Sequence, residues 1–407
     1  MRNLRFIENV TTLQGKKVLL RVDFNVRIDG GQVTEDFRIV KSMKTIDFLL
    51  KKGAKVILVS HIDKKEGGSL EPVSRYLTQF YPRLRFIDSP FSEEGKKEIN
   101  SLVEGGILLL ENIRHFEEEE QNGTPFAEAL AGVADLYVND AFSVSHREHA
   151  SIVGVPKFIP GFAGFQLKEE IEGLSKVNDP DHPFLFILGG AKFDTKLPLV
   201  EKFMGKADKV FIGGALANDL FKAKGYFVGE SLVSETPVDL DAILQSPKVV
   251  IPEDVVATYK GIATTKDPEK ISVGEKIVDI GEKTAGRLFS LISESKFVLW
   301  NGPMGKNELG FKRGSQSIVD AILASHAYSI VGGGDTISLL SDMNAFDKFS
   351  FVSTGGGAML DFLLYDTLPG IEALVQTKKK EVFEPTRINL GKEKSFFQKI
   401  FSFLKKK

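Results

Sequence analysis

The chain has 407 residues, a length that suits two or three domains better than one core. Apolar residues make up 42% and charged residues 27%, as in ordinary globular proteins, and the net charge of −2 offers no overall attraction for nucleic acid or membranes. Because cysteine is absent, disulfides, thiolate metal sites and cysteine nucleophiles are excluded, and a cytoplasmic location is expected.

Ten short runs rich in Val, Ile, Leu and Phe predict strands. They lie at 18–22, 56–59, 107–110, 136–138, 185–188, 210–212, 249–251, 297–300, 329–331 and 349–352. Within each run, apolar residues do not alternate with polar ones, and Gly or polar residues lie at its ends. Strands that are covered on both faces are expected to have this pattern. Amphipathic stretches such as 38–52 and 315–325 lie between most of them and predict helices. The alternation predicts an α/β fold with parallel sheets and right-handed crossovers.

A domain boundary is expected near residue 165. A Pro-Gly pair at 160–161 precedes a charged stretch, 166–177, which predicts a linking helix, and the run Asn-Asp-Pro-Asp then ends it. The expected parts of the chain are a first domain at 1–165, a linker at 166–182, a second domain at 183–360, a segment packing back on the first domain at 361–375, and a basic tail at 376–407.

In the first half of the chain, the strands end in polar and basic residues. The residues concerned are Asp23, Asn25, Arg38, His61, Arg114 and Arg147. Arginines at the strand ends of one sheet would converge on an anionic ligand, because a guanidinium matches carboxylate and phosphate in bidentate fashion. The alternatives are that the arginines are ordinary surface residues and that His61 is a packed or capping histidine.

In the second half, the strands end in glycine. Pairs of glycines lie at 189–190 and 213–214, and runs of three lie at 332–334 and 355–357. Glycine lets backbone N–H groups approach a ligand, and the N-terminus of a helix is partially positive, so phosphate binding is favoured over simple tight turns. Asp335, directly after the first run of three, could hold Mg²⁺ that is bound to phosphates.

The common nucleotide motifs are missing from the chain. No stretch has the P-loop spacing, and no G-x-G-x-x-G opens a helix after a strand, which disfavours a dinucleotide dehydrogenase. Lys192 and Lys196 follow a glycine pair and would share one helical face. Phosphate contact is the favoured interpretation of these lysines, and a merely solvated pair is the alternative.

These residues lie in stretches that resemble the phosphoglycerate kinase family, from about Asn3 to Leu374. The stretches are RVDFNV at 21–26, SH at 60–61, LENIR at 110–114, VNDAF at 138–142, HR at 146–147, HAS at 149–151, LGGAK at 188–192, WNGP at 300–303, GGGDT at 332–336, STGGGA at 353–358 and LPG at 368–370. Several are long and all stand in the family's order, so chance is excluded.

The resemblance implies two doubly wound α/β domains with parallel sheets, linked by a helix, with a ligand cleft between them. It implies a glycolytic, ATP-binding transferase that moves a phosphoryl group reversibly between 1,3-bisphosphoglycerate and ADP, giving 3-phosphoglycerate and ATP. In the ATP-consuming direction the acceptor is a carboxylate, which needs no general base, so positioning and charge stabilisation supply the catalysis. The resemblance also implies Mg²⁺, a monomer and no nucleic-acid partner.

Residue roles follow from the same resemblance. The residues expected to hold the acid substrate are Asp23, Phe24, Asn25, Arg38, His61, Lys64, Arg114 and Arg147. Those expected to hold the nucleotide are Lys192, Lys196, Gly214, Glu308, Gly333, Gly334, Asp335 and Thr336, with Asp335 near Mg²⁺. Arg38, Lys192 and Gly356 are expected to be catalytic, since they would stabilise the transferring phosphoryl group.

The chain departs from the family pattern at several edges of the site. Ile62-Asp63-Lys64-Lys65 stands where the family usually has Leu-Gly-Arg-Pro, and Ala215–Asn218 also differs, at the adenine pocket. Lys64 keeps the positive charge but loses the planar fork of an arginine. Two alternatives stay open: a non-catalytic nucleotide-binding member that acts through its tail, and a kinase for a different carboxylic acid.

The tail adds a separate hypothesis. Residues 376–407 carry nine Lys and one Arg against three Glu. Six apolar residues within 396–407 would form one face at helical spacing, which resembles a helix lying at a membrane interface and predicts weak contact with a membrane surface or a partner. Docking of the tail onto its own domain and a disordered tail are the alternatives.

Deletion of 376–407 tests the membrane interpretation of the tail. If the apolar face and the lysines contact a membrane surface, the full-length chain will co-sediment with liposomes and the truncated chain will not. Equal co-sedimentation of the two proteins would contradict the hypothesis.

Overall fold

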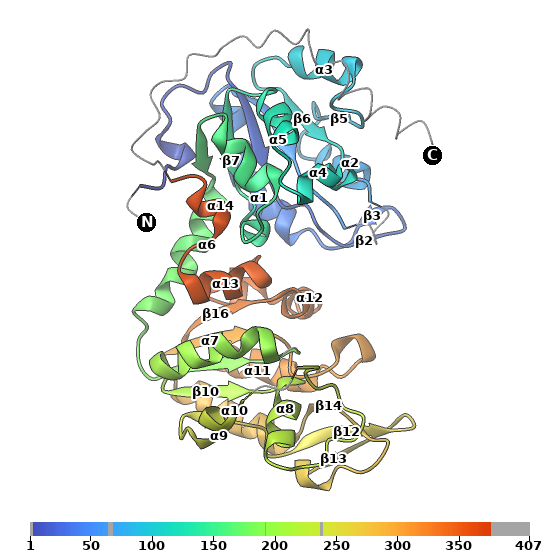
Figure 1. Ribbon diagram of the computed structural model, residues 1–407, viewed down its shortest axis with the longest axis vertical. Coiled ribbons are helices and arrows are strands. Elements are labelled where there is room, and N and C mark those ends of the chain that lie inside the picture. Colours follow the sequence, from blue (N-terminus) through green and yellow to red (C-terminus); the bar gives the residue numbers. More distant parts are fainter. Residues whose placement is uncertain (1–2, 64–67, 192, 237–238, 376–407) are drawn as a thin grey trace.

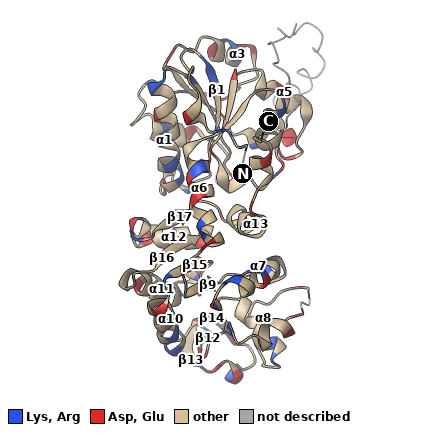
Figure 2. Cartoon of the chain, turned by 90° about the vertical axis from the view of Figure 1, so that its left-hand side faces the viewer, with Lys and Arg blue, Asp and Glu red and all other residues tan. Residues whose placement is uncertain are grey.

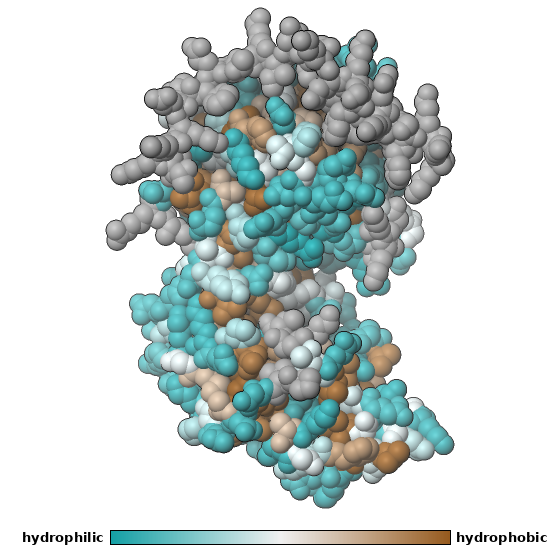
Figure 3. All heavy atoms as spheres, in the orientation of Figure 1, coloured by the Kyte–Doolittle hydropathy of each residue, from teal (hydrophilic) through white to brown (hydrophobic). Residues whose placement is uncertain are grey.

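The computed structural model describes residues 3–63, 68–191, 193–236 and 239–375. These residues form two lobes, the upper and lower parts of Figure 1, and the outline of the molecule narrows between them in Figure 3. Each lobe is built around a six-stranded sheet. The expected class, α/β with two doubly wound parallel sheets joined by a helix, is confirmed.

The first sheet is parallel throughout, in the order β5-β6-β4-β1-β7-β8. Its strands are β1 (Lys17–Arg21), β4 (Lys55–Val59), β5 (Arg85–Ile87), β6 (Ile107–Leu110), β7 (Leu136–Asn139) and β8 (Gly161–Ala163). Alternate residues of β4 pack into separate apolar clusters on the two faces, with Val56 and Leu58 in one and Ile57 and Val59 in the other. This two-sided burial explains the continuous apolar runs of the sequence.

The second sheet is also parallel, in the order β11-β10-β9-β15-β16-β17. Its strands are β9 (Phe184–Leu188), β10 (Lys209–Ile212), β11 (Val249–Val250), β15 (Phe297–Asn301), β16 (Tyr328–Gly332) and β17 (Phe351–Ser353). When the six strands are renumbered 1 to 6 by their order along the chain, they lie side by side in the order 3-2-1-4-5-6, as in dinucleotide-binding folds. The order reverses between β9 and β15, and ligands bind at such a reversal, beyond the carboxyl ends of the strands.

Helices connect the strands in both lobes. In the first they are α1 (Phe37–Lys51), α2 (Glu71–Leu77), α3 (Glu93–Asn100), α4 (Glu117–Glu120) and α5 (Thr124–Ala131). In the second they are α7 (Phe193–Lys206), α8 (Leu216–Ala223), α9 (Asp241–Gln245), α10 (Glu282–Glu294), α11 (Arg313–Ala324), α12 (Gly334–Asp342) and α13 (Gly357–Tyr365). None of the described helices combines the length and apolar composition that crossing a bilayer requires.

Each of the ten predicted strands overlaps an observed strand, but the prediction was incomplete. It missed β5 and β8, which are only three residues long, and it missed an antiparallel sheet in the second lobe. That sheet consists of β12 (Val255–Tyr259), β13 (Ile262–Lys266) and β14 (Lys276–Ile280). A two-residue turn, Lys260-Gly261, joins β12 to β13 with positive φ at both residues, the geometry that hairpins favour. A small hairpin of β2 (Ile28–Asp29) and β3 (Gln32–Val33) was missed as well.

Helix α6 (Phe165–Ser175) lies between the lobes, as expected for the linker (Figure 2). At its N-terminus, the Asp140 carboxylate accepts hydrogen bonds from the N–H groups of Gln166 and Leu167 at 2.8 and 3.2 Å. One turn later, the Glu170 carboxylate accepts bonds from the N–H and hydroxyl of Thr354, both at 2.6 Å. Asp140 belongs to the first lobe and Thr354 to the second, so a single turn of α6 connects them.

The last described residues lie against the first lobe. In α14 (Pro369–Glu372), the Gly370 N–H donates to the Ser145 carbonyl at 2.8 Å, and Val375 forms a β-bridge with Leu4. The domain limits expected from the sequence stay a prediction. The tail, 376–407, lies outside the described residues.

Replacing Glu170 by alanine tests the connection through α6. The substitution leaves the N–H and hydroxyl of Thr354 buried without an acceptor, at about 1–3 kcal/mol for each unsatisfied group. We expect a clear fall in Tm in thermal unfolding followed by circular dichroism. Glu169→Ala is the matched control, because Glu169 is the neighbouring carboxylate, pairs with Lys44 at the surface and should contribute little. Equal Tm values for the two variants would contradict the prediction.

Candidate active site

Candidate ligand residues gather at the carboxyl ends of the strands in both sheets. In the first sheet, Asp23 and Asn25 follow β1, His61 follows β4 and Arg114 follows β6. In the second sheet, the glycine pairs follow β9 and β10, and the three-glycine runs follow β16 and β17. Both arrangements match the expectation that ligands bind outside the carboxyl ends of parallel strands.

Arg38 lies in the first turn of α1 and connects the two lobes. Its Nη1 donates to the Asn25 carbonyl at 2.9 Å and lies 3.2 Å from the Asp23 carboxylate. Its Nη2 donates to the Thr354 carbonyl, at 3.2 Å, in the loop that follows β17. The guanidinium therefore touches the strand-end loops of both sheets.

His61 contacts a hydrogen-bonded network of buried side chains. The Arg21 guanidinium, which is fully buried at the end of β1, donates to Ser151 Oγ at 2.9 Å and lies 3.2 Å from His61 Nδ1. Ser151 donates in turn to the buried Glu119 carboxylate at 2.6 Å.

Burial, followed by the charges of Arg21 and Arg114, lowers the pKa of His61 well below its usual value. His61 is therefore neutral at physiological pH. The sequence showed Arg21 only as part of the stretch at 21–26 and did not predict the role of Glu119, which Arg21 reaches through Ser151.

Arg114 and Asn25 meet at Asp63. Arg114 Nη1 lies 2.5 Å from Asp63 Oδ1, and Asn25 Nδ2 donates to Asp63 Oδ2 at 3.2 Å. The Asp63 N–H donates back to Asn25 Oδ1 at 3.1 Å. Four of the predicted acid-site residues, Asp23, Asn25, Arg38 and Arg114, are thus joined into one set of contacts, and His61 contacts Arg21.

The other three predicted acid-site residues are placed differently. The side chain of Phe24 is buried in the core of the first lobe, so only its backbone could face a ligand. Arg147 is exposed and follows the 3₁₀ turn Phe142–Val144. Lys64 lies outside the described residues. The roles expected for these three stay predictions.

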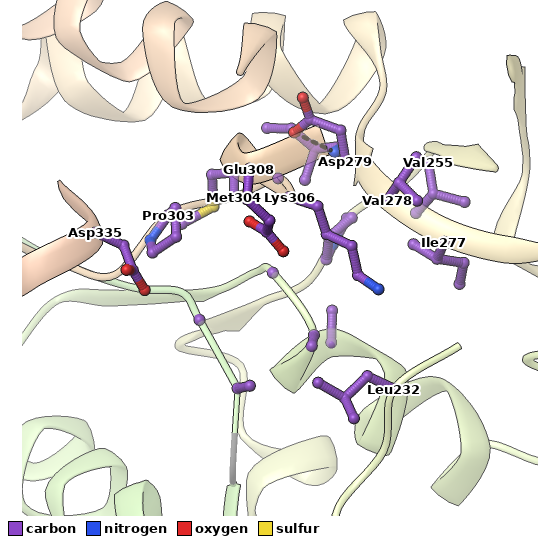
Figure 4. A pocket seen from close by; sticks show the side chains of 18 of the residues that line it. Leu232, Val255, Ile277, Val278, Asp279, Pro303, Met304, Lys306, Glu308 and Asp335 are labelled. Atoms are coloured by element: carbon purple, nitrogen blue, oxygen red, sulfur yellow. Dashed lines mark hydrogen bonds between the residues drawn. The ribbon is translucent and has the colours of Figure 1, made fainter. Parts of the chain in front are cut away.

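The second lobe contains two adjoining hollows beside the β9–β15 reversal. The larger by total empty space, which is about 700 Å³ with the open solvent at its mouth included, has an apolar end lined by residues that include Phe221, Leu232, Val255 and Ile277. In Figure 4, Asp335 lies at the opposite end, with Glu308 and Lys306 between. The smaller hollow, of about 580 Å³, is lined by Lys196, Gly333, Gly334, Asp335 and Thr336 among others. An apolar end and a polar end suit a ligand with a ring and phosphates.

Glycine is required where the loops between these hollows touch. Gly190, Gly214 and Gly302 all have positive φ, and a Cβ on Gly214 would lie 2.6 Å from the Gly190 nitrogen. A Cβ on Gly302 would lie 2.5 Å from the Gly189 carbonyl oxygen. The backbone itself forms the floor of the site, as a glycine-lined phosphate site requires.

Two helix N-termini and one lysine provide the positive potential of the polar end. Helices α12 and α13 begin beside each other, because a Cβ on Gly356 would lie 3.7 Å from the Gly334 nitrogen. Lys196 Nζ donates to the Gly189 carbonyl at 2.7 Å. Burial lowers the pKa of Lys196 to about 8, with Asp335 opposing the shift. Lys192 lies outside the described residues.

The residues around Asp335 fit a magnesium ion that is held mainly by phosphate oxygens. Asp335 lies in the first turn of α12, and the hydroxyl of the neighbouring Thr336 is buried without a hydrogen-bond partner among the described residues. The described part of the chain contains no group of three or more metal-ligating side chains. One carboxylate is what Mg²⁺ commonly uses when phosphates supply further ligands.

The loop after β17 lies against the first lobe. A Cβ on Gly355 would lie 2.6 Å from the Phe142 ring, and one on Gly357 would lie 3.3 Å from His146 Nε2. Gly356 therefore stands at the N-terminus of α13, at the junction of the two lobes. The loop needs glycine here because side chains of the first lobe occupy the space.

The apolar end of the larger hollow was not predicted from the sequence. Val255, Ile277 and Val278 come from the antiparallel sheet, and Leu232 comes from the segment after α8. The two β-branched runs on either side of Lys260-Gly261 were the available signal for a hairpin.

The chain is similar to known proteins over most of its length. The family model for phosphoglycerate kinase matches residues 7–364. Phosphoglycerate kinase of Dictyoglomus turgidum is 42% identical over 380 residues, which cover 89% of this chain and 96% of that protein. That of Geobacter metallireducens is 40% identical over 396 residues, covering 92% and 100%.

Solved structures show the same similarity. The crystal structure of phosphoglycerate kinase from Pyrococcus horikoshii superposes with a TM-score of 0.81 at 30% identity, covering 91% of this chain and 98% of that one. The structure of phosphoglycerate kinase from Coxiella burnetii has a TM-score of 0.76 at 33% identity, with the same coverage.

The lowered pKa of Lys196 predicts a pH-dependent affinity for a phosphate-bearing nucleotide. As the pH rises through about 8, the free protein loses the ammonium charge, so the KM for ATP should rise above pH 8 by up to about tenfold per pH unit. Steady-state kinetics between pH 6.5 and 9.5 measure this.

Two variants of Lys196 check the assignment. Lys196→Arg keeps its charge over this range and should give a flat profile, whereas Lys196→Ala should bind weakly at every pH. A rise in KM that persists unchanged in Lys196→Arg would assign the titration to another group.

Proposed function

The chain belongs to the phosphoglycerate kinase family, and we propose that its acid substrate binds at the first sheet and its nucleotide at the second. The enzyme is a glycolytic phosphotransferase. It moves a phosphoryl group reversibly between 1,3-bisphosphoglycerate and ADP, giving 3-phosphoglycerate and ATP. The observation that supports the placement of the substrates is Arg38, whose guanidinium contacts Asn25 in one strand-end loop and Thr354 in the other.

In the ATP-consuming direction, the carboxylate of 3-phosphoglycerate attacks the terminal phosphorus of ATP. A carboxylate is ionised at neutral pH, so no proton has to be removed, and the neutral His61 is available as a hydrogen-bonding group. The remaining task is to hold the two substrates in line and to stabilise the charge on the phosphoryl oxygens. Asn25 and Arg114 hold the acid, and Arg38 faces the phosphoryl group.

On the nucleotide side, the apolar end of the larger hollow takes the base and Glu308 takes the ribose. The N–H groups at the starts of α12 and α13, together with Lys196, face the phosphates. A bound Mg²⁺ would neutralise phosphate charge, and Asp335 with the hydroxyl of Thr336 would hold it. Lys192 is proposed as a further phosphoryl contact on the family resemblance alone.

The two substrate sites belong to different lobes, so we infer that the lobes approach each other during the reaction. Closing would bring the reacting groups together and exclude water, which would otherwise hydrolyse ATP. The enzyme is proposed to act as a monomer in the cytoplasm on small-molecule substrates, without a nucleic-acid partner.

Replacing Arg38 by alanine tests the catalytic assignment. Loss of the guanidinium removes charge stabilisation from the transferring phosphoryl group and should lower kcat about 100- to 1,000-fold. A coupled assay of ATP use with 3-phosphoglycerate measures this. Arg75→Ala is the control, because Arg75 is an exposed arginine of the same lobe that pairs with Glu71. A full-rate Arg38→Ala would refute the proposed mechanism.

A further inference from the structure

Asp63 occupies an unusual place in the acid site. It stands directly after the His61 loop, and its carboxylate contacts two groups that the proposed function gives to the substrate. One oxygen lies 2.5 Å from Arg114 Nη1, and the other accepts a hydrogen bond from Asn25 Nδ2 at 3.2 Å. The site therefore contains an anionic group of the protein itself.

The Asp63 carboxylate and an anionic substrate require the same donors. A carboxylate or phosphate oxygen of the substrate would bind the Arg114 guanidinium and the Asn25 amide in the way that Asp63 does. Arg114 Nη1 and Asn25 Nδ2 each carry a second N–H, but the N–H groups that point at Asp63 cannot form a close, well-aligned bond to the substrate at the same time. Binding of the substrate to these same N–H groups therefore requires that Asp63 give up at least one contact.

The surroundings allow Asp63 to move away. Its side chain is 51% exposed, whereas that of Arg114 is 11% exposed, so Asp63 can turn into solvent while Arg114 stays in place. Arg114 also has a second carboxylate beside it, since its Nε lies 3.4 Å from Glu120. Arg114 therefore keeps an ionic partner when Asp63 leaves.

We propose that Asp63 is an internal competitor for the acid substrate and sets the enzyme's affinity for it. In the free enzyme its carboxylate occupies Arg114 and Asn25, and the substrate must displace it. This weakens the binding of 3-phosphoglycerate without affecting the nucleotide site. The inference rests on the proposed function of Arg114 and Asn25 as acid-site residues.

Asp63→Asn is the variant that tests this proposal. Asparagine has the same shape and keeps the backbone N–H bond to Asn25, but it removes the charge that competes for Arg114. For a partly exposed ion pair of this kind, the KM for 3-phosphoglycerate should fall about two- to fivefold. The KM for ATP and kcat should stay unchanged. Calorimetric titration with 3-phosphoglycerate in the absence of nucleotide should show the same gain in affinity.

Two further variants sharpen the test. Asp63→Gly removes the side chain altogether and should lower the KM as Asp63→Asn does. Glu120→Gln removes an equal charge from beside the same guanidinium, but near Nε rather than near the Nη1 that Asp63 contacts. It should change the KM less than Asp63→Asn. If Glu120→Gln lowered the KM for 3-phosphoglycerate as much as Asp63→Asn does, the net charge of the site alone would set the affinity, and the proposal would be overturned.

The Arg114→Ala variant separates this proposal from the proposed function. If Arg114 binds the acid, Arg114→Ala raises the KM for 3-phosphoglycerate, and adding Asp63→Asn to it lowers the KM by less than Asp63→Asn does in the wild-type chain, because only the contact with Asn25 is left. An unchanged KM in Arg114→Ala would refute the role of Arg114. A raised KM in Arg114→Ala, together with an unchanged or raised KM in Asp63→Asn, would leave the role of Arg114 intact and overturn the competitor role of Asp63.

Discussion

The buried carboxylate of Glu170 holds the active-site region together. It accepts two hydrogen bonds from Thr354 and a third from the Gln166 side chain at 3.0 Å, so the linking helix and the loop after β17 form one unit. Burial raises the pKa of Glu170, while the bonds from Thr354 favour the ionised form. The Thr354 carbonyl is then available to Arg38. From Arg38, contacts continue through Asn25 and Asp63 to Arg114. A chain of polar contacts thus connects the linker and the loop after β17 to the residues proposed to bind the acid.

The two proposed sites would bind anions by different physical means. The acid site would rely on guanidinium groups, which bind carboxylate and phosphate with fixed geometry. Such groups need support when they are buried, and Arg21 obtains it from Ser151, with Glu119 as the nearby opposite charge. The proposed nucleotide site would rely on backbone N–H groups and on Lys196, and a backbone N–H is less costly to bury than a charged guanidinium. This difference explains why one row of strand ends is rich in arginine and the other in glycine.

Much of this arrangement could be predicted from the sequence, because the sheets are buried on both faces and their strands read as apolar runs. The search for apolar runs did not identify β13, because most of its residues are exposed and it contains no such run. It also failed for β5 and β8, which are too short to stand out. The contacts of Asp63 could not be predicted either, because they join loops after β1, β4 and β6 and depend on how those strands lie side by side. The sequence showed only that Asp63 departs from the family pattern.

The attachment of α6 limits how the lobes can move. Asp140 fixes the helix at Gln166 and Leu167, and Thr354 fixes it at Glu170, all within about one turn. Hydrogen bonds to buried charged groups are costly to break, so this turn acts as a rigid joint between the sheets. A change in the angle between the lobes must therefore be absorbed outside it. Gly164 is also held, because its N–H donates to the Asn139 carbonyl at 2.9 Å. We therefore expect the movement in the segments beyond α6 and beyond the glycine loop at 355–357, where none of the described buried carboxylates joins the two lobes.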